Sequence, residues 1–296
     1  MGDEGFWGPV DSAVDFCEPN YASTWLIAET FNALSSIFYI VAGAEGAYRA
    51  FHNGSNASIL VSFFTLVMVG TGSMIFHVTM RSWGEIWDVI PMLLLTQMIL
   101  WTLQNTHPLL DMDNGFGVYT YFGTFLLTLL SLIAYVTLRV YDIFMTSFTI
   151  QCTFAGILTI FAQRHTRTAA RYVWAFIICI LTGKILLEIE KVYCDSIPFV
   201  WISHVGWHIF SCLAVYYWVL CAECIQHERS IKKGKILHDV DDVAKLDKEV
   251  AKRVKDFSFQ LSRENRSLSV SGILENNLKV LKNMLKRTDF DKKKNE

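Results

Sequence analysis

Long apolar stretches separated by short polar breaks fill the chain from residue 24 to residue 224. They lie at residues 24–45, 58–79, 84–104, 117–138, 141–163, 172–192 and 201–224. Each approaches the roughly 20 apolar residues that a helix needs to cross a bilayer. The break at Arg139 is the weakest, so a merge or a split there would give six or eight stretches. The pattern predicts an all-α membrane protein, a bundle of seven transmembrane helices.

Composition and charge separate this apolar region from the end of the chain. Hydrophobic residues make up 52% of the chain and charged residues only 18%, against about 25% charged in an ordinary globular chain. Residues 226–296 hold 18 Lys/Arg and 12 Asp/Glu, whereas residues 1–225 hold 8 Lys/Arg and 16 Asp/Glu. This distribution excludes a secreted protein, a nucleic-acid-binding protein and an ordinary cytosolic enzyme. We expect an acidic N-terminal hairpin at 1–23, a transmembrane domain at 24–225 and a polar tail at 226–296, partly helical or disordered.

The distribution of basic residues predicts an orientation, because they concentrate in the cytosolic loops of membrane proteins. With a lumenal N-terminus, the cytosolic side receives the basic tail and the loop that carries Arg164, Arg167 and Arg171. We therefore expect a lumenal N-terminus and a cytosolic C-terminus. The chain then ends in the cytosol with Lys293 and Lys294, which fit a dilysine retrieval signal. This predicts the endoplasmic reticulum membrane, with the Golgi as a second compartment.

Ionisable and hydroxyl side chains recur near the lumenal ends of three predicted helices. The second stretch carries Ser73 and His77, and the seventh carries His204 and His208. Within each pair the spacing of four residues puts both side chains on one helix face. Asp88 lies in the first turns of the third stretch. Because the second helix runs toward the lumen and the other two start there, all five side chains share one depth, where ionisable groups are functional candidates.

Three imidazoles at one depth predict a metal site. They fill three of the four tetrahedral positions on zinc and leave the fourth for water, which is the open geometry of a catalytic site. Zinc lowers the pKa of that water to about 7. Asp88 could then hydrogen-bond a ligand histidine or the water, and Ser73 could donate to a developing oxyanion. The alternative, histidines that only join helices through hydrogen bonds, explains the common depth less well.

The segment before the first apolar stretch is acidic. Asp15, Glu18, Asn20 and Glu29 place four oxygen-bearing side chains within fifteen residues, and calcium prefers oxygen ligands. The alternative is a solvated lumenal N-terminus. Glu29 favours a cation site, because it lies about one turn inside an apolar stretch, where an unpaired carboxylate is costly.

Cysteines and one charged pair complete the candidate features. Five cysteines lie in apolar stretches, where we expect buried thiols: Cys152, Cys179, Cys212, Cys221 and Cys224. Cys17 and Cys194 lie on the predicted lumenal side in polar surroundings, and a disulfide between them suits an oxidising compartment. Lys184 and Glu188 are four residues apart in the sixth stretch. We interpret them as an internal ion pair, with a contact to a substrate headgroup as the alternative.

Several motifs resemble those of the alkaline ceramidases, seven-helix intramembrane amide hydrolases of a superfamily that includes the adiponectin-receptor-like proteins. The stretch GFWGPVDSAVDFCEPNYASTWLIAE is similar to the family's opening signature and is the most specific part. GTGSMIFH is similar to its Ser-x-x-x-His segment, WDVIPM to its Asp-Glu-x-Pro-Met motif and HVGWH to its His-x-x-Trp-His motif. The resemblance covers about residues 5–225. Phe16, Val89 and Gly206 depart from the family pattern, which leaves the acyl-chain and sphingoid-base preference open.

The resemblance implies zinc-dependent hydrolysis of the ceramide amide bond within the membrane, giving a sphingoid base and a free fatty acid. Zinc would be bound by His77, His204 and His208. Ser73 would assist at the oxyanion, and Asp88 would assist in proton transfer.

The resemblance also implies calcium support and a lumenal disulfide between Cys17 and Cys194. Calcium would be bound by the side chains of Asp15, Glu18, Asn20 and Glu29 and by a main-chain oxygen of Phe16. The expected partner is a ceramide-type lipid in the membrane and not a nucleic acid, and the sequence identifies no protein partner.

Two other functions suit the same residues. One is a seven-helix receptor of the same superfamily, with a structural metal site. The other is a hydrolase that acts on a different lipid. The acidic hairpin and the Cys17–Cys194 pair favour the ceramidase branch.

Overall fold

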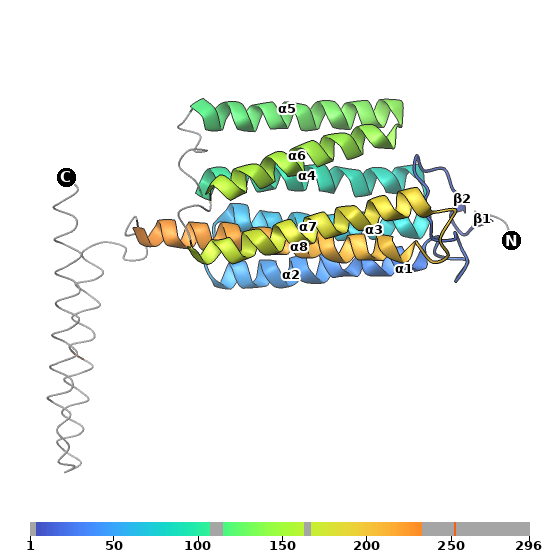
Figure 1. The fold of residues 1–296 in the computed structure, drawn as a ribbon, viewed down its shortest axis with the longest axis horizontal. Helices are drawn as coiled ribbons and strands as arrows, with labels where there is room; N and C mark the ends of the chain where they lie inside the picture. Colours follow the sequence, from blue (N-terminus) through green and yellow to red (C-terminus); the bar gives the residue numbers. More distant parts are fainter. Residues whose placement is uncertain (1–3, 107–114, 163–166, 233–251, 253–296) are drawn as a thin grey trace, which may run out of the picture. The chain divides into compact units, whose positions relative to one another are not determined.

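A computed structural model describes residues 4–106, 115–162, 167–232 and 252 of the chain (Figure 1). The chain divides into two units, Met1–Lys232 and Lys233–Glu296. The fold described below is that of the first unit. Most of the predicted tail, including the dilysine pair Lys293 and Lys294, lies outside the described residues.

Helices make up most of the first unit (Figure 1). Two short helices come first, α1 (Thr30–Ser35) and α2 (Ile37–His52). Six long helices follow: α3 (Ala57–Thr79), α4 (Ser82–Thr106), α5 (Gly115–Leu138), α6 (Tyr141–Ala162), α7 (Arg167–Tyr193) and α8 (Ile202–Lys232). Near the N-terminus, β1 (Glu4–Gly5) and β2 (Gly8–Pro9) form a two-stranded antiparallel hairpin. The predicted helical class of the membrane region is confirmed.

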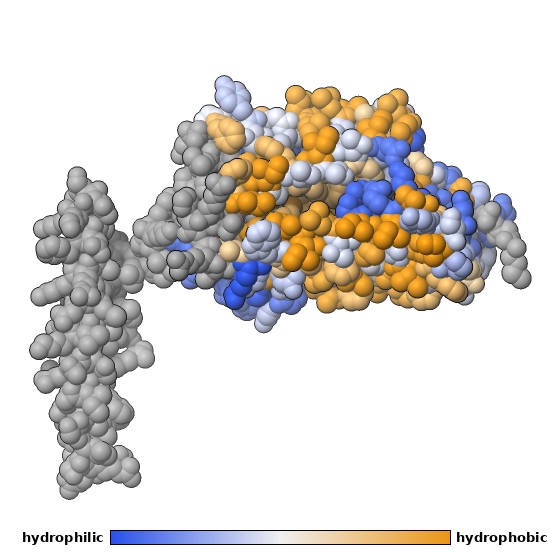
Figure 2. Space-filling view, viewed as in Figure 1, coloured by the Kyte–Doolittle hydropathy of each residue, from blue (hydrophilic) through white to orange (hydrophobic). Residues whose placement is uncertain are grey.

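All six long helices are long and apolar enough to cross a membrane. They match six of the predicted stretches to within a few residues at most ends, and α8 extends furthest beyond its prediction, to Lys232. Apolar side chains cover much of the outer surface of the bundle (Figure 2). Helix α5 is the least buried of the six, since only 17% of its apolar 18-residue stretch is buried inside the protein. Such an apolar outer surface suits a multi-pass protein surrounded by lipid.

The first predicted stretch, 24–45, differs most from the structure, because residues 24–29 are not helical. The N–H groups of Ala28 and Glu29 instead bond to the carbonyls of Val78 and His77, at 3.0 and 2.9 Å. Those carbonyls lie in the last turn of α3 and have no partner within that helix. Helix α1 therefore starts only at Thr30, and α1 and α2 follow each other with one residue between them. Neither helix alone reaches the roughly 20 residues of a membrane span.

A buried polar network fastens α5 and α6 to α4. Gln151 Oε1 on α6 accepts hydrogen bonds from Thr96 on α4, at 2.9 Å, and from Thr128 on α5, at 2.7 Å. Gln97 Nε2 on α4 also donates to Thr128, at 2.8 Å. Hydrocarbon offers no water to satisfy such groups, so polar side chains in a membrane hold helices together by bonding to one another.

Helices α3 and α4 approach each other closely at Gly72. A Cβ atom on Gly72 would lie 2.0 Å from the carbonyl oxygen of Trp87, so a larger residue would force the helices apart. Ser73 and Asp88 are the next residues along the two helices. The close approach therefore brings these two predicted catalytic side chains to the same place.

The N-terminal segment (residues 4–29) covers the end of the bundle where α3 ends and α8 begins (Figure 1). A disulfide joins Cys17 in this segment to Cys194 between α7 and α8, as predicted. The Ala13 N–H also donates to Glu85 Oε2 on α4, at 2.7 Å. These contacts attach the segment to the connection between α7 and α8 and to helix α4.

The other five cysteines are free thiols. Cys179, Cys212 and Cys221 are buried, whereas Cys152 and Cys224 are partly buried. The prediction of buried thiols is therefore confirmed for three of the five.

Candidate metal centre

The three predicted histidines meet where the last turn of α3 faces the first turns of α8. One ring nitrogen from each of His77, His204 and His208 lies within 4.8 Å of the others. The ring centroids are separated by 5.1, 5.0 and 4.7 Å, and all three side chains are buried. Among the described residues, this is the one group of three or more His, Cys, Asp or Glu side chains gathered so closely. The three side chains could hold a metal ion.

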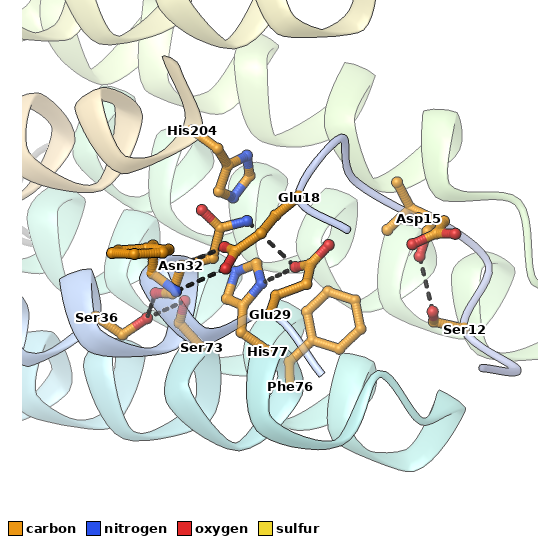
Figure 3. Close-up of polar contacts among 12 residues, drawn as sticks. Ser12, Asp15, Glu18, Glu29, Asn32, Ser36, Ser73, Phe76, His77 and His204 are labelled. Atoms are coloured by element: carbon orange, nitrogen blue, oxygen red, sulfur yellow. Dashed lines mark hydrogen bonds and ion pairs between the residues drawn. The ribbon is translucent and has the colours of Figure 1, made fainter. Parts of the chain in front are cut away.

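Each histidine uses its Nδ1 atom for a hydrogen bond to a different residue, and Figure 3 shows the bond between His77 and Glu29. The partner of His77 is Glu29 Oε2, at 2.5 Å, and the partner of His204 is Glu190 Oε2, at 2.7 Å. Because an ionised carboxylate only accepts hydrogen bonds, Nδ1 of each ring carries the proton. Each Nε2 then keeps a lone pair for a metal, the arrangement in which a second shell orients histidine ligands.

The third histidine is oriented by a hydroxyl group. Nδ1 of His208 lies 2.7 Å from Ser35 Oγ, and Ser35 donates its own proton to the carbonyl of Asn32, at 2.9 Å. Ser35 must therefore accept the hydrogen of His208 Nδ1, which again leaves Nε2 with a lone pair. The chemistry of this donor set fits zinc with three imidazole ligands and an open fourth position.

Ser73 and Asp88 face the histidines across a small cavity. The cavity has a volume of about 20 Å³ and is lined by both residues and by His204 and His208. That is enough room for one water molecule. Ser73 Oγ lies 3.0 Å from Ser36 Oγ, and Ser36 donates to the Asn32 carbonyl. Ser73 is then the donor to Ser36. The Ser73 hydroxyl would have to rotate toward the cavity before it could donate a hydrogen bond to an oxyanion there.

The predicted calcium ligands lie in and beside the N-terminal segment. Asn20 Nδ2 donates to Asp15 Oδ1, at 2.9 Å. Glu18 accepts the N–H groups of Phe31 and Asn32, at 2.8 and 2.9 Å, and so binds the first turn of α1. These acidic groups are less tightly gathered than the histidines.

Two of the predicted calcium ligands have a side-chain oxygen that is buried without a hydrogen-bond partner, Glu29 Oε1 and Asn20 Oδ1. Buried acceptors without donors are unfavourable unless something positive lies near them. Burial also raises the pKa of Glu18, and the two N–H groups that it accepts partly oppose that change. A bound cation would relieve both conditions, so these residues fit a calcium ion by their chemistry. Phe16, whose main-chain oxygen is the fifth expected ligand, packs its ring 4.0 Å from that of His204.

Sequence reasoning missed three residues of this site, Glu190, Ser35 and Ser36. Glu190 is 2% exposed near the end of α7. Its Oε2 atom holds His204, and its Oε1 atom accepts the N–H of Cys17, at 3.1 Å. The rule that ionisable groups in membrane helices are functional candidates could have found it, since it lies in an apolar stretch. No pattern in the sequence distinguishes Ser35 or Ser36 from other small polar residues.

Two of the larger cavities that adjoin the metal centre share Met145 with the small cavity. One of about 510 Å³ lies between the N-terminal segment, α6 and α7; it is called the polar cavity because seven charged side chains, among them Lys184, are in its walls. An almost wholly apolar one of about 320 Å³ runs between α6 and α7. Met145 lines both of these cavities and also the small cavity beside the histidines. The three spaces therefore meet at one side chain, an arrangement that suits a ligand with a polar head and an apolar chain.

Comparisons with known proteins agree with this arrangement. A profile of the family described as Ceramidase matches residues 8–241. The chain is 28% identical to Alkaline ceramidase YPC1 of Saccharomyces cerevisiae, over 74% of this chain and 78% of that protein. It is also 28% identical to Alkaline ceramidase of Arabidopsis thaliana, over 71% of this chain and 82% of that protein. Alkaline ceramidase 3 of Mus musculus is 32% identical over a shorter region, 30% of this chain and 34% of that protein.

Proposed function

This chain belongs to the ceramidase family of hydrolases, and from that premise we propose that it hydrolyses the amide bond of ceramide-type lipids within the membrane. The products are a sphingoid base and a free fatty acid. Zinc is held by His77, His204 and His208, and calcium supports the site from the N-terminal segment. The observation that carries this proposal is that Glu29, Glu190 and Ser35 hold the three histidines through Nδ1. Each Nε2 is then available to a shared metal ion beside Ser73 and Asp88.

The residues around the small cavity have separate tasks. Zinc at the three histidines would supply Lewis acidity for the carbonyl and make water a better nucleophile at neutral pH. Asp88, whose side chain lines the cavity, accepts a proton from the attacking water and delivers it to the amide nitrogen as the carbon–nitrogen bond breaks. Ser73 turns its hydroxyl from Ser36 toward the cavity and donates to the oxygen on which negative charge develops.

The cavities support a lipid substrate. The apolar space between α6 and α7 takes a hydrocarbon chain, and the polar space under the N-terminal segment takes the head of the lipid. Met145, where the spaces meet, lies beside the histidines. A ligand that occupies both spaces would present the bond between its head and its chain to the metal centre.

The proposed topology has seven spans, with α1 and α2 together as the first. Thr30–Ser35 and Ile37–His52 are separated only by Ser36, so together they have the length of a membrane span. The basic loop and tail favour a lumenal N-terminus and a cytosolic C-terminus, in the endoplasmic reticulum membrane and the Golgi. Residues 1–23 would then be the lumenal hairpin, 24–225 the catalytic domain and 226–296 the cytosolic tail.

This topology predicts that two glycosylation sequons stay unmodified. Asn53 and Asn56 each begin an Asn-x-Ser sequence, and both lie between α2 and α3, on the side proposed to be cytosolic. Glycosidase treatment of the protein from eukaryotic cells should leave its electrophoretic mobility unchanged. A shift that disappears in an Asn53→Gln/Asn56→Gln variant would reverse the proposed orientation.

The proposed reaction is tested with purified protein in detergent that contains zinc and calcium. Ceramide, dihydroceramide and phytoceramide are supplied separately, and free sphingoid base is measured by mass spectrometry. We expect release from at least one substrate by the native protein and by His52→Ala, a control that removes an exposed histidine of α2. Absence of release from all three, with zinc bound, would favour a receptor of the same superfamily or a hydrolase of another lipid.

Removal of calcium is expected to lower activity without removing zinc. Glu18 holds the start of α1, and Ser35 on the same helix holds His208, so a loosened N-terminal segment disturbs a metal ligand indirectly. Activity is measured with a calcium-selective chelator, followed by calcium or magnesium. Calcium alone should restore the rate, because magnesium does not readily occupy a site of several protein oxygens. Unchanged activity in the chelator would contradict the calcium proposal.

A further inference from the structure

An ion pair lies inside the membrane region of α7, beside the cavities. Lys184 Nζ is 2.6 Å from Glu188 Oε1, and the two side chains are 32% and 51% exposed. Lys184 is nine residues from Tyr193, where α7 ends, which corresponds to about 14 Å along the helix. The predicted ion pair is confirmed. Charged groups at such depth are costly and usually serve a function.

The pair does not join α7 to another part of the protein. Both residues belong to one helix, and among the described residues each forms a salt bridge with the other alone. Lys191 on the same helix differs, since it reaches Asp142 on α6, at 3.1 Å. An ion pair at this spacing stabilises its own helix only slightly, whereas a pair that held the bundle together would reach a neighbouring helix.

The position of the pair points to a ligand. Both residues line the polar cavity, and Lys184 also lines the apolar cavity between α6 and α7. The ammonium group therefore stands at the boundary between the space for a polar head and the space for a hydrocarbon chain. Leu187, between the two residues in sequence, lines both the polar cavity and the small cavity at the histidines.

We infer that Lys184 and Glu188 bind the primary hydroxyl group at the head of the substrate and so determine the preference for hydroxylated sphingoid lipids. This inference rests on the proposed function. A hydroxyl group both donates and accepts, so it can donate to the Glu188 carboxylate while it accepts from the Lys184 ammonium. In a ceramide the primary hydroxyl is on the carbon next to the one that bears the amide nitrogen. An amide at Ser73 and Asp88 therefore places this hydroxyl near the polar cavity.

The experiment compares ceramide with 1-deoxyceramide, which lacks the primary hydroxyl. The ratio of kcat/KM for the two substrates is measured for the native protein, for Glu188→Gln and for Lys184→Leu/Glu188→Leu. We expect the native protein to prefer ceramide and the ratio to fall roughly tenfold or more in both variants, as for loss of a hydrogen bond to a charged group. The double variant leaves no unpaired charge in the membrane, and Glu188→Gln keeps the size of the side chain.

Ile178→Leu/Ile185→Leu is the matched control, because it changes two exposed residues of the same helix that line neither cavity. Its ratio should equal that of the native protein. If the variants hydrolyse ceramide with an unchanged ratio, the inference is wrong and the proposed function stands. If the native protein hydrolyses neither substrate, both the proposed function and this inference are wrong.

Discussion

Replacing His208 with alanine is expected to remove zinc and to lower ceramide hydrolysis by about a thousandfold or more. The three histidines supply all the nitrogen ligands of the group, and two imidazoles alone bind zinc much more weakly than three. The chemical step also depends on the charge that the metal provides, so loss of the ion removes several kcal/mol of transition-state stabilisation. Zinc content by elemental mass spectrometry and sphingoid-base release are measured on the same samples.

The variant should remain folded. Outside the metal centre, the imidazole of His208 hydrogen-bonds to Ser35 Oγ, and Ser35 keeps its bond to the Asn32 carbonyl. Thermal unfolding in detergent should therefore shift by only a few degrees beyond the shift caused by zinc loss itself. His52→Ala serves again as control and should keep both zinc and activity. Native-level hydrolysis by His208→Ala would contradict the zinc proposal.

The helices of the bundle could be predicted from local hydropathy, with one exception. Six apolar stretches correspond to α3 through α8 because each carries its own signal along the sequence. The start of the first stretch could not be predicted, because Ala28 and Glu29 bond to the end of α3, nearly 50 residues away. Hydropathy describes burial in the membrane and contains no information on which backbone groups need a partner.

The histidines could be predicted because their chemistry conflicts with an apolar surrounding, and the same conflict indicated Lys184 and Glu188. The residues that orient the histidines could not be predicted in this way. Ser35 becomes important only through its distance from His208, and that distance depends on how α1 packs against α8. Glu29 was predicted as a calcium ligand, yet the structure also gives it a bond to His77 that no spacing in the sequence implies.

Glu29 and Glu190 form a pair of carboxylates with similar contacts and different expected effects. Each binds Nδ1 of one histidine of the candidate metal centre. Glu29 is the last residue of the N-terminal segment, and Glu190 bonds to that segment through the Cys17 N–H. They differ in the second oxygen. Glu190 Oε1 accepts the Cys17 N–H, whereas Glu29 Oε1 is buried without a partner and is free for calcium. Substitution by glutamine separates these two situations, because it replaces one of the two oxygens by a donor.

Glu29→Gln is expected to raise the calcium concentration for half-maximal activity about tenfold or more, since calcium affinity depends on ligand charge. Oε2 of Glu29 accepts from both His77 Nδ1 and Asn32 Nδ2, so the amide oxygen must stay on that side. The amide nitrogen then takes the place of Oε1 and turns its hydrogens toward the proposed cation. Because the bond to His77 survives, zinc affinity should change much less.

Glu190→Gln is expected to show the opposite pattern. Both of its oxygens face donors, so a glutamine must lose the bond to His204 or the bond to the Cys17 N–H. Loss of a second-shell partner typically lowers metal affinity by about 10–100-fold. Zinc affinity is measured by competition with a chromogenic chelator, and the calcium response by titration of activity in saturating zinc. If both variants lose zinc and calcium binding alike, the two carboxylates have one common structural role, and the assignment of calcium to Glu29 Oε1 is wrong.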